Sequence, residues 1–228
     1  MKVGIIADVH SNIWALGAVL EKLGDVEKIV CAGDITGFYT RPNEVVEMLA
    51  EKNVLAVLGE HDQALLSGET RELRGAGRMA AIWSRGIANG KTLRFLKKLR
   101  PSVTFRIGGR RILIAHRTPS GGFPNGILPD TSTRDVVRAI MEIDADIIIL
   151  GHNHLPLRRM ALGKIIVNPG SVGQPRDRNP RASYAILKLG EDVEVEFQRV
   201  DYNVDAAAKE VIEAGLSEEL VTRLKVGW

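Results

Sequence analysis

All five histidines of the chain follow short apolar runs, in blocks of sequence that also carry carboxylates. The blocks are Asp8-Val9-His10, Gly33-Asp34, Gly59-Glu60-His61-Asp62, Ala115-His116 and Gly151-His152-Asn153-His154. Histidines placed by packing alone would not gather in this way. We therefore expect these blocks to meet at one site and to share one chemical task.

Imidazole and carboxylate groups together suit divalent transition metals such as Mn, Fe, Ni, Co or Zn. The candidate ligands are Asp8, His10, Asp34, Glu60, His116, His152 and His154. Seven ligands are too many for one tetrahedral zinc site, but they are natural for two metals that share a bridging carboxylate. Two metals about 3.5–4 Å apart are a recurrent device for the hydrolysis of phosphate esters. The residue types therefore predict a two-metal hydrolytic centre.

Two of the blocks place their candidate ligands two residues apart. These are Asp8-x-His10 and His152-x-His154. In an extended chain, residues two apart point to the same side. We therefore expect each pair to present two ligands to one place.

The elements that must position these blocks begin as alternating strands and helices. Short apolar runs at 2–7, 28–31 and 54–58 predict strands. Helices are predicted between them, one capped by Asn12 and one opened by Pro42. Such an alternation favours an α/β fold, in which sites form at the carboxyl ends of the strands.

The second half of the chain adds hairpins to this pattern. Residues 64–99 are predicted as mostly helical, 117–130 as a long loop and 131–143 as a helix. Strands are predicted at 103–107, 111–115, 146–150, 165–167, 183–189 and 193–200, and two short helices follow them. A mixed sheet, or two packed sheets with helices outside, fits this pattern better than a purely parallel sheet.

Composition limits the class of protein. The chain has 228 residues, of which 45% are hydrophobic and 26% charged, so a disordered or fibrous chain is excluded. We expect one domain, 1–228. The net charge of +3 is too small to indicate nucleic-acid binding, and no apolar run approaches the ~18 residues of a membrane span. With the single cysteine Cys31 and no secretory signal, we expect a cytoplasmic protein.

Taken together, the ordered blocks resemble the signature of the calcineurin-like metallophosphoesterases. That signature is Asp-x-His, Gly-Asp, Gly-Asn-His-Asp, a histidine and Gly-His-x-His. The resemblance spans roughly residues 2–200. The segments Asp8–Asn12, Gly33–Phe38, Arg41–Val46 and Asn168–Arg176 look like the small prokaryotic phosphodiesterase branch.

The resemblance implies a fold and a set of roles. The fold would be two packed mixed β-sheets flanked by helices, in the order α-β-β-α. Asp8, His10 and His154 would hold the first metal, Asp34 would bridge, and Glu60, His116 and His152 would complete the second site. A hydroxide bridging the two metals would attack phosphorus in line. His61 would act as a general acid, oriented by Asp62. Manganese is the expected metal, with Ni, Co, Fe or Zn as alternatives.

Glu60 departs from the family, which normally carries asparagine there. Two divalent metals bring +4, while Asp8, Asp34 and a bridging hydroxide bring −3. An ionised Glu60 would make the centre neutral, so that it attracts a phosphate dianion less well. We therefore expect a preference for phosphodiesters over monoesters, or a loss of activity.

Arg117 and Asn12 are the candidate contacts to substrate. Arg117 directly follows His116, where relatives often have glycine. Its guanidinium group could bind the substrate phosphate in a bidentate manner, or it could point outward into solvent. The loop at 168–173 could supply backbone donors to the phosphate, and Arg176 could line the cleft.

Three other functions remain open. A non-catalytic binding scaffold on the same fold is one of them, because Glu60 replaces the usual asparagine. A nucleotide or dinucleoside-polyphosphate hydrolase is another. A protein serine/threonine phosphatase is less favoured, since the sequence lacks the Gly-Asp-x-x-Asp-Arg-Gly motif of those relatives. The expected partner is a small phosphate ester; neither a membrane nor nucleic acid is expected, and homo-oligomerisation is left open.

Overall fold

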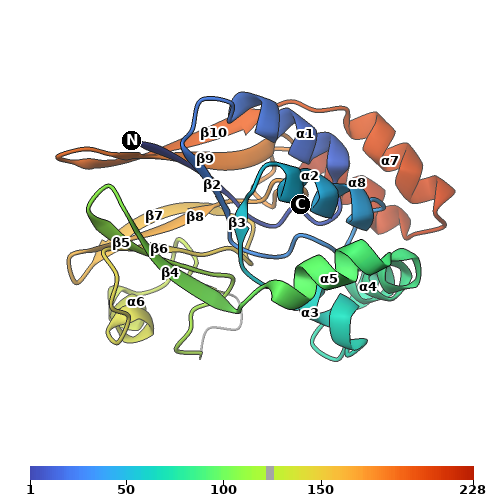
Figure 1. Cartoon of the computed structure of the whole chain (residues 1–228). Helices are drawn as coiled ribbons and strands as arrows, with labels where there is room; N and C mark the ends of the chain where they lie inside the picture. The colour runs from blue at the N-terminus through green and yellow to red at the C-terminus, as the bar shows by residue number, and fades with distance from the viewer. Residues whose placement is uncertain (122–125) are drawn as a thin grey trace.

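The computed structural model of the chain describes residues 1–121 and 126–228 and contains two five-stranded sheets with helices around them (Figure 1). The strands are β1 (Lys2–Ile6), β2 (Lys28–Cys31), β3 (Leu55–Ala56), β4 (Ser102–Ile107), β5 (Arg110–Ala115), β6 (Ile147–Ile149), β7 (Pro156–Ala161), β8 (Lys164–Pro169), β9 (Ala182–Leu189) and β10 (Val193–Val200). The helices are α1 (Ile13–Lys22), α2 (Pro42–Glu51), α3 (Glu60–Ser67), α4 (Gly75–Ile87), α5 (Gly90–Lys98), α6 (Thr133–Ile140), α7 (Val204–Glu213) and α8 (Glu218–Val226).

Both sheets mix parallel and antiparallel pairing. The first has the order β10-β9-β1-β2-β3, in which β1, β2 and β3 are parallel and β9 and β10 antiparallel. The second has the order β4-β5-β6-β8-β7, in which β5, β6 and β8 are parallel. The predicted α/β fold with two mixed sheets flanked by helices is confirmed.

The two sheets pack face to face through aliphatic side chains. Val3, Ile5 and Val30 of the first sheet meet Ile112 and Ile149 of the second, and all five are buried. Most of these residues are β-branched and fit a pleated surface. Replacing Ile149 with alanine should cost about 2–5 kcal/mol of unfolding free energy, because the cavity cannot refill.

Helices cover the outer faces of the sheets. α1 and α2 pack on the first sheet through residues such as Leu16, Val19 and Leu49, and α6 packs on the second through Val136 and Ile140.

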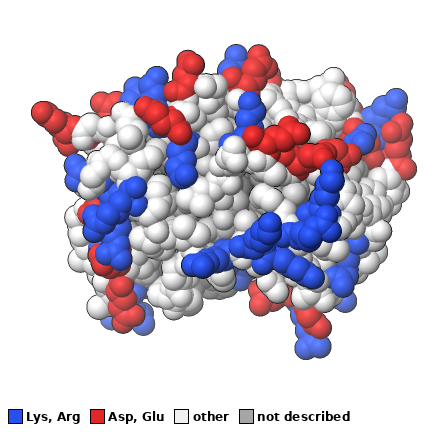
Figure 2. Space-filling model, in the orientation of Figure 1, with Lys and Arg blue, Asp and Glu red and all other residues white. Residues whose placement is uncertain are grey.

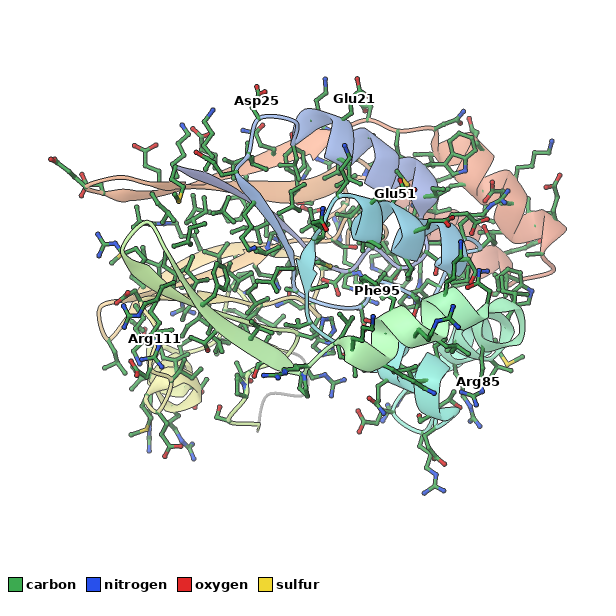
Figure 3. The ribbon with its side chains drawn as sticks, in the orientation of Figure 1. Glu21, Asp25, Glu51, Arg85, Phe95 and Arg111 are labelled. Atoms are coloured by element: carbon green, nitrogen blue, oxygen red, sulfur yellow. The ribbon has the colours of Figure 1, made fainter. Side chains whose placement is uncertain are left out.

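The C-terminal end of α3 is capped by an arginine of α4. Arg85 donates to the carbonyl oxygens of Leu65 and Leu66 at 2.5 and 2.7 Å, and Figure 3 labels this side chain. A cation there also complements the negative end of the helix dipole.

The last two helices, α7 and α8, form a hairpin that docks beside the loop between β2 and α2. Ala207, Val211 and Leu220 share a buried cluster with Phe38 and Tyr39 of that loop. On the outer side, Glu210 of α7 forms an ion pair of 2.9 Å with Arg41 and accepts a hydrogen bond of 2.8 Å from Thr40. The hairpin is therefore fixed against the part of the chain that follows Asp34.

Three elements differ from the sequence-based predictions. β7 was not predicted, because Pro156 and Arg158–Met160 do not give an alternating apolar pattern. β3 covers only Leu55–Ala56 of the predicted 54–58, and α3 begins at Glu60, four residues earlier than the predicted helical region. Part of the loop predicted at 117–130 lies outside the described residues. No helix among residues 1–121 and 126–228 is long and apolar enough to cross a membrane.

Candidate metal centre and active-site cleft

The carboxyl ends of the parallel strands bring all seven predicted metal ligands together. Among the described residues, ligand atoms lying within 4.8 Å of one another form four overlapping groups. These groups are Asp8–His10–His154, Asp8–Asp34–His116, Glu60–His116–His152 and His10–Asp34–His61. We call the seven predicted ligands the histidine–carboxylate cluster. His152 and His154 fall into different groups, so this pair does not present both its ligands to one place.

Most of the cluster sits in left-handed backbone rather than in extended strand. Asp8, His10, Asp34, His152 and His154 have φ values of +53°, +50°, +51°, +79° and +64°. The expected extended backbone is therefore wrong for both pairs, although Asp8 and His10 do present their ligand atoms to one group. Left-handed backbone is costly for residues other than glycine and persists where the surroundings enforce it, often at functional sites.

Backbone carbonyl groups fix the rings of three of the histidines. The Nδ1 atom of His10 lies 3.2 Å from the oxygen of Thr36, and that of His116 lies 2.7 Å from the oxygen of Ala32. His154 makes the same contact to Gln174. Because a carbonyl oxygen only accepts, each Nδ1 carries a proton and each Nε2 faces the cluster, where it can bind a cation once it is deprotonated. Outer hydrogen bonds of this kind are typical of metal-binding histidines.

The lone pairs of His10 and His154 face each other. Their Nε2 atoms are 3.1 Å apart in a fully buried environment. Burial and the neighbouring imidazole lower the pKa of His10 well below its ordinary value, and burial does the same to His154. Both rings are then neutral, so two lone pairs converge beside the carboxylate of Asp8. A cation accounts for this arrangement better than a shared proton does.

A second convergence involves Glu60. Its Oε2 lies 2.8 Å from His116 Nε2, and its Oε1 lies 2.7 Å from His152 Nδ1. His116 Nε2 is also 3.3 Å from Asp34 Oδ2. Burial pushes the pKa of His116 downward, but Asp34 and Glu60 outweigh it and hold this pKa well above its ordinary value. In the absence of metal, a proton thus takes the place that a cation would fill.

Asp34 lies between the two convergences, where close backbone approach fixes it. One of its oxygens accepts a hydrogen bond of 2.9 Å from the backbone N–H of His61. A side chain at Gly59 would place its Cβ atom 2.1 Å from the same oxygen, so only glycine is tolerated before Glu60. Burial, with the nearby Asp34 among the lesser causes, raises the pKa of Asp8 to about 7. The cluster offers imidazole nitrogens and carboxylate oxygens as ligands, and its neighbouring carboxylates repel one another when no cation lies between them. Both features fit a site for two divalent cations.

His61 and Asp62 lie beside the cluster, and their predicted roles stay predictions. The His61 ring is buried, 4.9 Å from the His10 ring and 4.6 Å from the Phe38 ring between centroids. Asp62 accepts hydrogen bonds from the backbone of Ile35, Thr36 and Gly59 and from the Thr36 hydroxyl. None of these bonds reaches the His61 ring, and together they brace the loop after Asp34.

Asn12 and the 168–173 loop make hydrogen bonds within the protein, and their predicted contacts to substrate stay predictions. Asn12 is buried; its Oδ1 caps α1 through Ala15 N–H at 3.1 Å, and its Nδ2 donates to the oxygen of Gly173 at 3.0 Å. The N–H groups of Val172 and Gly173 donate to the carbonyl oxygens of Ala7 and Asp8. Nothing in these placements supports the predicted contacts to substrate; the loop instead braces the turn that carries Asp8.

A cleft of about 960 Å³ opens over the cluster. Its walls include Glu60, His61 and His152 from the predicted site, and also Phe38 and four arginines. Arg117 does point into this cleft rather than into bulk solvent: its Nε lies 3.3 Å from Glu60 Oε2, and its Nη1 lies 3.4 Å from Glu72. The sequence did not indicate that Arg117 pairs with Glu60, the candidate ligand that departs from the family pattern.

The other cleft arginines are Arg74, Arg176 and Arg223. Sequence analysis missed Arg223 because it lies in a helix far from every recognisable motif. It also missed Phe38 as a wall of the site. The apolar spacing of Leu220 and Leu224 predicts the buried side of α8, but nothing local indicates what lies opposite it.

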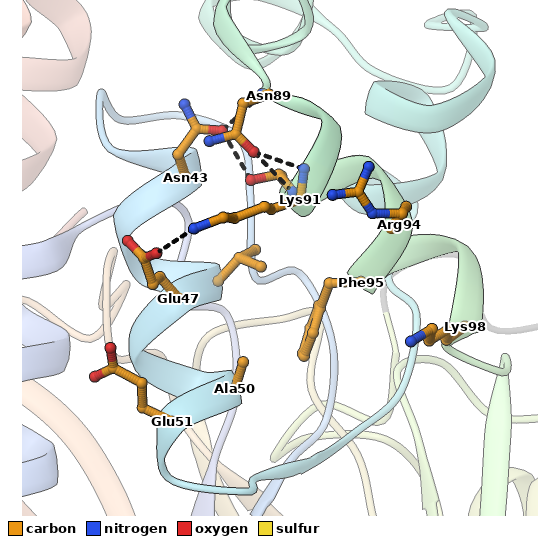
Figure 4. Close-up of a pocket in the computed structure, with 11 residues that line it drawn as sticks. Asn43, Glu47, Ala50, Glu51, Asn89, Lys91, Arg94, Phe95 and Lys98 are labelled. Atoms are coloured by element: carbon orange, nitrogen blue, oxygen red, sulfur yellow. Dashed lines mark hydrogen bonds and ion pairs between the residues drawn. The ribbon is translucent and has the colours of Figure 1, made fainter.

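A second hollow, of about 380 Å³, lies between α2 and α5 (Figure 4). Several of its polar groups pair with one another: Lys91 pairs with Glu47 at 3.3 Å, and Asn43 Oδ1 accepts from Asn89 N–H and the Thr92 hydroxyl. On the face of Figure 2, basic side chains form a band over the region where α5 runs, with acidic side chains above it; Lys91, Arg94 and Lys98 of α5 also line the hollow. This face carries none of the metal-ligating groups found among the described residues.

Comparison with known proteins identifies the family. The model of the calcineurin-like phosphoesterase superfamily domain matches residues 1–192. An uncharacterized protein of Methanocaldococcus jannaschii, MJ0912, is 32% identical over 99% of this chain and 98% of its own length. The crystal structure of a metallophosphoesterase from Sphaerobacter thermophilus is 32% identical, with a TM-score of 0.83 over 100% of this chain and 99% of that one. The hypothetical protein PH1004 of Pyrococcus horikoshii shares the fold, with a TM-score of 0.90 over 100% and 98% of the two chains at 24% identity. The chain belongs to the calcineurin-like phosphoesterase superfamily.

Proposed function

We propose that the protein is a metal-dependent phosphodiesterase that hydrolyses a small phosphate diester. Asp8, His10 and His154 would hold one divalent metal ion, and Glu60, His116 and His152 would hold the other. Asp34 would contact both. When bound, two such ions supply an activated water and stabilise charge on the attacking and leaving oxygens. Manganese is the proposed metal, with Ni, Co, Fe or Zn as alternatives.

The observation that carries the preference for diesters is the position of Glu60. Its carboxylate is held between His116 and His152 at 2.8 and 2.7 Å. Asp8, Asp34 and Glu60 together neutralise most of the charge of two divalent cations. A diester carries one negative charge and a monoester close to two, so the extra carboxylate penalises the monoester more.

His61 is the proposed proton donor to the leaving oxygen. Burial lowers the pKa of His61, and the nearby carboxylates of Asp34 and Glu60 partly counter this effect. Its protonated form is therefore a ready donor. The Phe38 ring, packed at 4.6 Å between centroids, holds the imidazole in place and keeps water from one of its faces.

The test compares hydrolysis of bis(p-nitrophenyl) phosphate and p-nitrophenyl phosphate after loading with Mn, Ni, Co, Zn or Mg. We expect bound metal and a clear preference for the diester. A metal-free, inert protein would contradict the proposal and favour a binding scaffold.

His61→Ala separates the proposed proton donor from a metal ligand. We expect slower turnover with an unchanged metal content, since donation by a positioned group contributes about a hundredfold or more. Loss of metal in this variant would show instead that His61 is a ligand, in line with its distance to His10 and Asp34.

A further inference from the structure

Arg176 and Arg223 reach the cleft from two segments that are far apart in sequence. Arg176 follows the 168–173 loop, while Arg223 lies on α8, beyond the residues 1–192 that the family model matches. Their guanidinium carbons lie 6.0 and 5.8 Å from the centroid of the Phe38 ring. Both contacts are within the range of cation–π interactions. We call Arg176 and Arg223 the arginine pair.

A neutral amide holds the arginine pair. Gln174 Oε1 accepts from Arg176 Nη2 at 3.3 Å and from Arg223 Nη1 at 3.4 Å. Gln174 is itself fixed, because its Nε2 donates to the Tyr39 hydroxyl at 2.9 Å. Sharing one acceptor keeps the two cations close together, and partial desolvation in the cleft wall and the adjacent Arg223 lower the pKa of Arg176. Two like charges this close are unfavourable unless something binds between them.

Carboxylates do not balance this charge. Within the described residues Arg176 forms no ion pair, and Arg223 pairs only with Glu219, on its own helix, at 2.5 Å. The Nε atom of Arg223 is buried without a hydrogen-bond partner. The pair therefore keeps a net positive charge at the wall of the cleft.

The arginine pair lies near the metal ligands without contacting them directly. No hydrogen bond or ion pair joins it to the carboxylates of the histidine–carboxylate cluster in the part of the chain that the structure describes. Phe38, which both arginines contact, packs instead against His10 and His61, with centroid distances of 4.6 Å to each. An anion bound to the pair would thus sit beside the reacting phosphate, on the side of Phe38 and His61.

We infer that the arginine pair binds a second anionic group of the substrate, so that the favoured substrate carries a phosphate or carboxylate besides the phosphorus attacked. This inference rests on the proposed phosphodiesterase function and narrows its substrate class. The C-terminal hairpin would then be a specificity element, because it delivers Arg223 to the cleft.

The test uses alkylenediphosphonates with one to four methylene groups, each against the alkylphosphonate of the same chain length. Inhibition of bis(p-nitrophenyl) phosphate hydrolysis and calorimetric binding are measured at a constant free metal concentration. In the wild type we expect one spacer length to bind at least tenfold more tightly than its monophosphonate. Arg223→Gln should weaken binding of that diphosphonate about tenfold, as expected for the loss of a charge-assisted hydrogen bond. The same variant should weaken binding of the monophosphonate by a several-fold smaller factor.

Two further variants control for charge and folding. Lys225→Gln removes the same charge from α8 at an exposed side chain that pairs with Asp205 and does not line the cleft, and it should leave both affinities unchanged. Arg223→Lys should recover part of the lost affinity. An unchanged melting temperature excludes unfolding.

Equal weakening of both ligands in Arg223→Gln would overturn the inference, because the pair would then serve the reacting phosphate. No weakening of either ligand would also overturn it. Arg223-dependent binding of a diphosphonate to a protein that hydrolyses no phosphodiester would contradict the proposed function and still support the second anion site.

Discussion

Arg117 and the arginine pair line the same cleft, but their surroundings differ in kind. Arg117 is paired with two carboxylates, Glu60 at 3.3 Å and Glu72 at 3.4 Å. The arginine pair is held by the neutral side chain of Gln174. A guanidinium group facing carboxylates is already neutralised and tunes the centre. Arg176, held by an amide and without a carboxylate partner among the described residues, keeps its charge for a ligand, while Arg223 shares its charge only with Glu219 on its own helix. The group with which an arginine pairs therefore decides whether the arginine tunes the charge of the centre or binds an anionic ligand.

Asp34 belongs to the centre beside which both regions lie, and removing its charge should have the largest effect. Asp34→Asn takes a carboxylate from between the two convergences of ligands. We expect kcat for bis(p-nitrophenyl) phosphate to fall on the order of a thousandfold, equivalent to about 4 kcal/mol of barrier. Steady-state kinetics together with metal analysis would check this. A variant that keeps a tenth of the activity would show that Asp34 is not shared between two ions.

Substitutions of Arg117 and Glu60 should have coupled effects on catalysis, because the two side chains form an ion pair. Arg117→Gln leaves the buried Glu60 charge without its cation, and we expect kcat/KM for the diester to fall about tenfold. In the double variant with Glu60→Asn part of that loss should return, which a double-mutant cycle measures. Arg78→Gln, an exposed change on α4 away from the cleft, is the matched control. If the effects of the two substitutions were additive in this cycle, the proposed coupling of Arg117 and Glu60 would be contradicted.

Glu60→Asn by itself should shift the choice between substrates. Without this carboxylate the centre gains positive charge, and the dianionic monoester benefits more than the monoanionic diester. We expect the ratio of monoester to diester kcat/KM to rise several-fold. The two substrates above serve as the assay, and an unchanged or lower ratio would be evidence against the charge argument.

Salt should produce the smallest effect and should distinguish the two regions. Arg176 is exposed in the cleft, whereas the Glu60 side of the Arg117 pair is largely shielded. Raising NaCl from about 0.05 to about 0.5 M should weaken diphosphonate binding a few-fold by screening. The effect of Arg117→Gln on diester hydrolysis should change less over the same range. If diphosphonate binding and the effect of Arg117→Gln depended equally on salt, the proposed difference between the two regions would be contradicted.

The sequence allowed much of this arrangement to be predicted, because its signals were local. Apolar runs predicted the strands, and neighbouring parallel strands bring their carboxyl ends to one edge, so that Asp8 and Asp34, which follow β1 and β2, could be expected together. His116 follows β5 of the other sheet and joins them through the packing of the two sheets. The identity of each ligand followed from the chemistry of its side chain and from the family resemblance.

What could not be predicted depends on backbone conformation and on distant contacts. Extended geometry was assumed for Asp8 and His10, but both adopt left-handed backbone, which their side chains do not indicate. The pairing of Arg117 with Glu72 joins residues 45 positions apart, and Gln174 meets Arg223 over 49. No periodicity in the sequence encodes such contacts.

The metal content of the purified protein tests the central claim most directly. Elemental mass spectrometry after equilibration with manganese and removal of free metal should find two ions per chain in the wild type. It should find about one in His116→Ala, because this variant loses a ligand of only one site. Fewer than one ion per chain in the wild type would contradict the two-metal centre on which the proposed function rests.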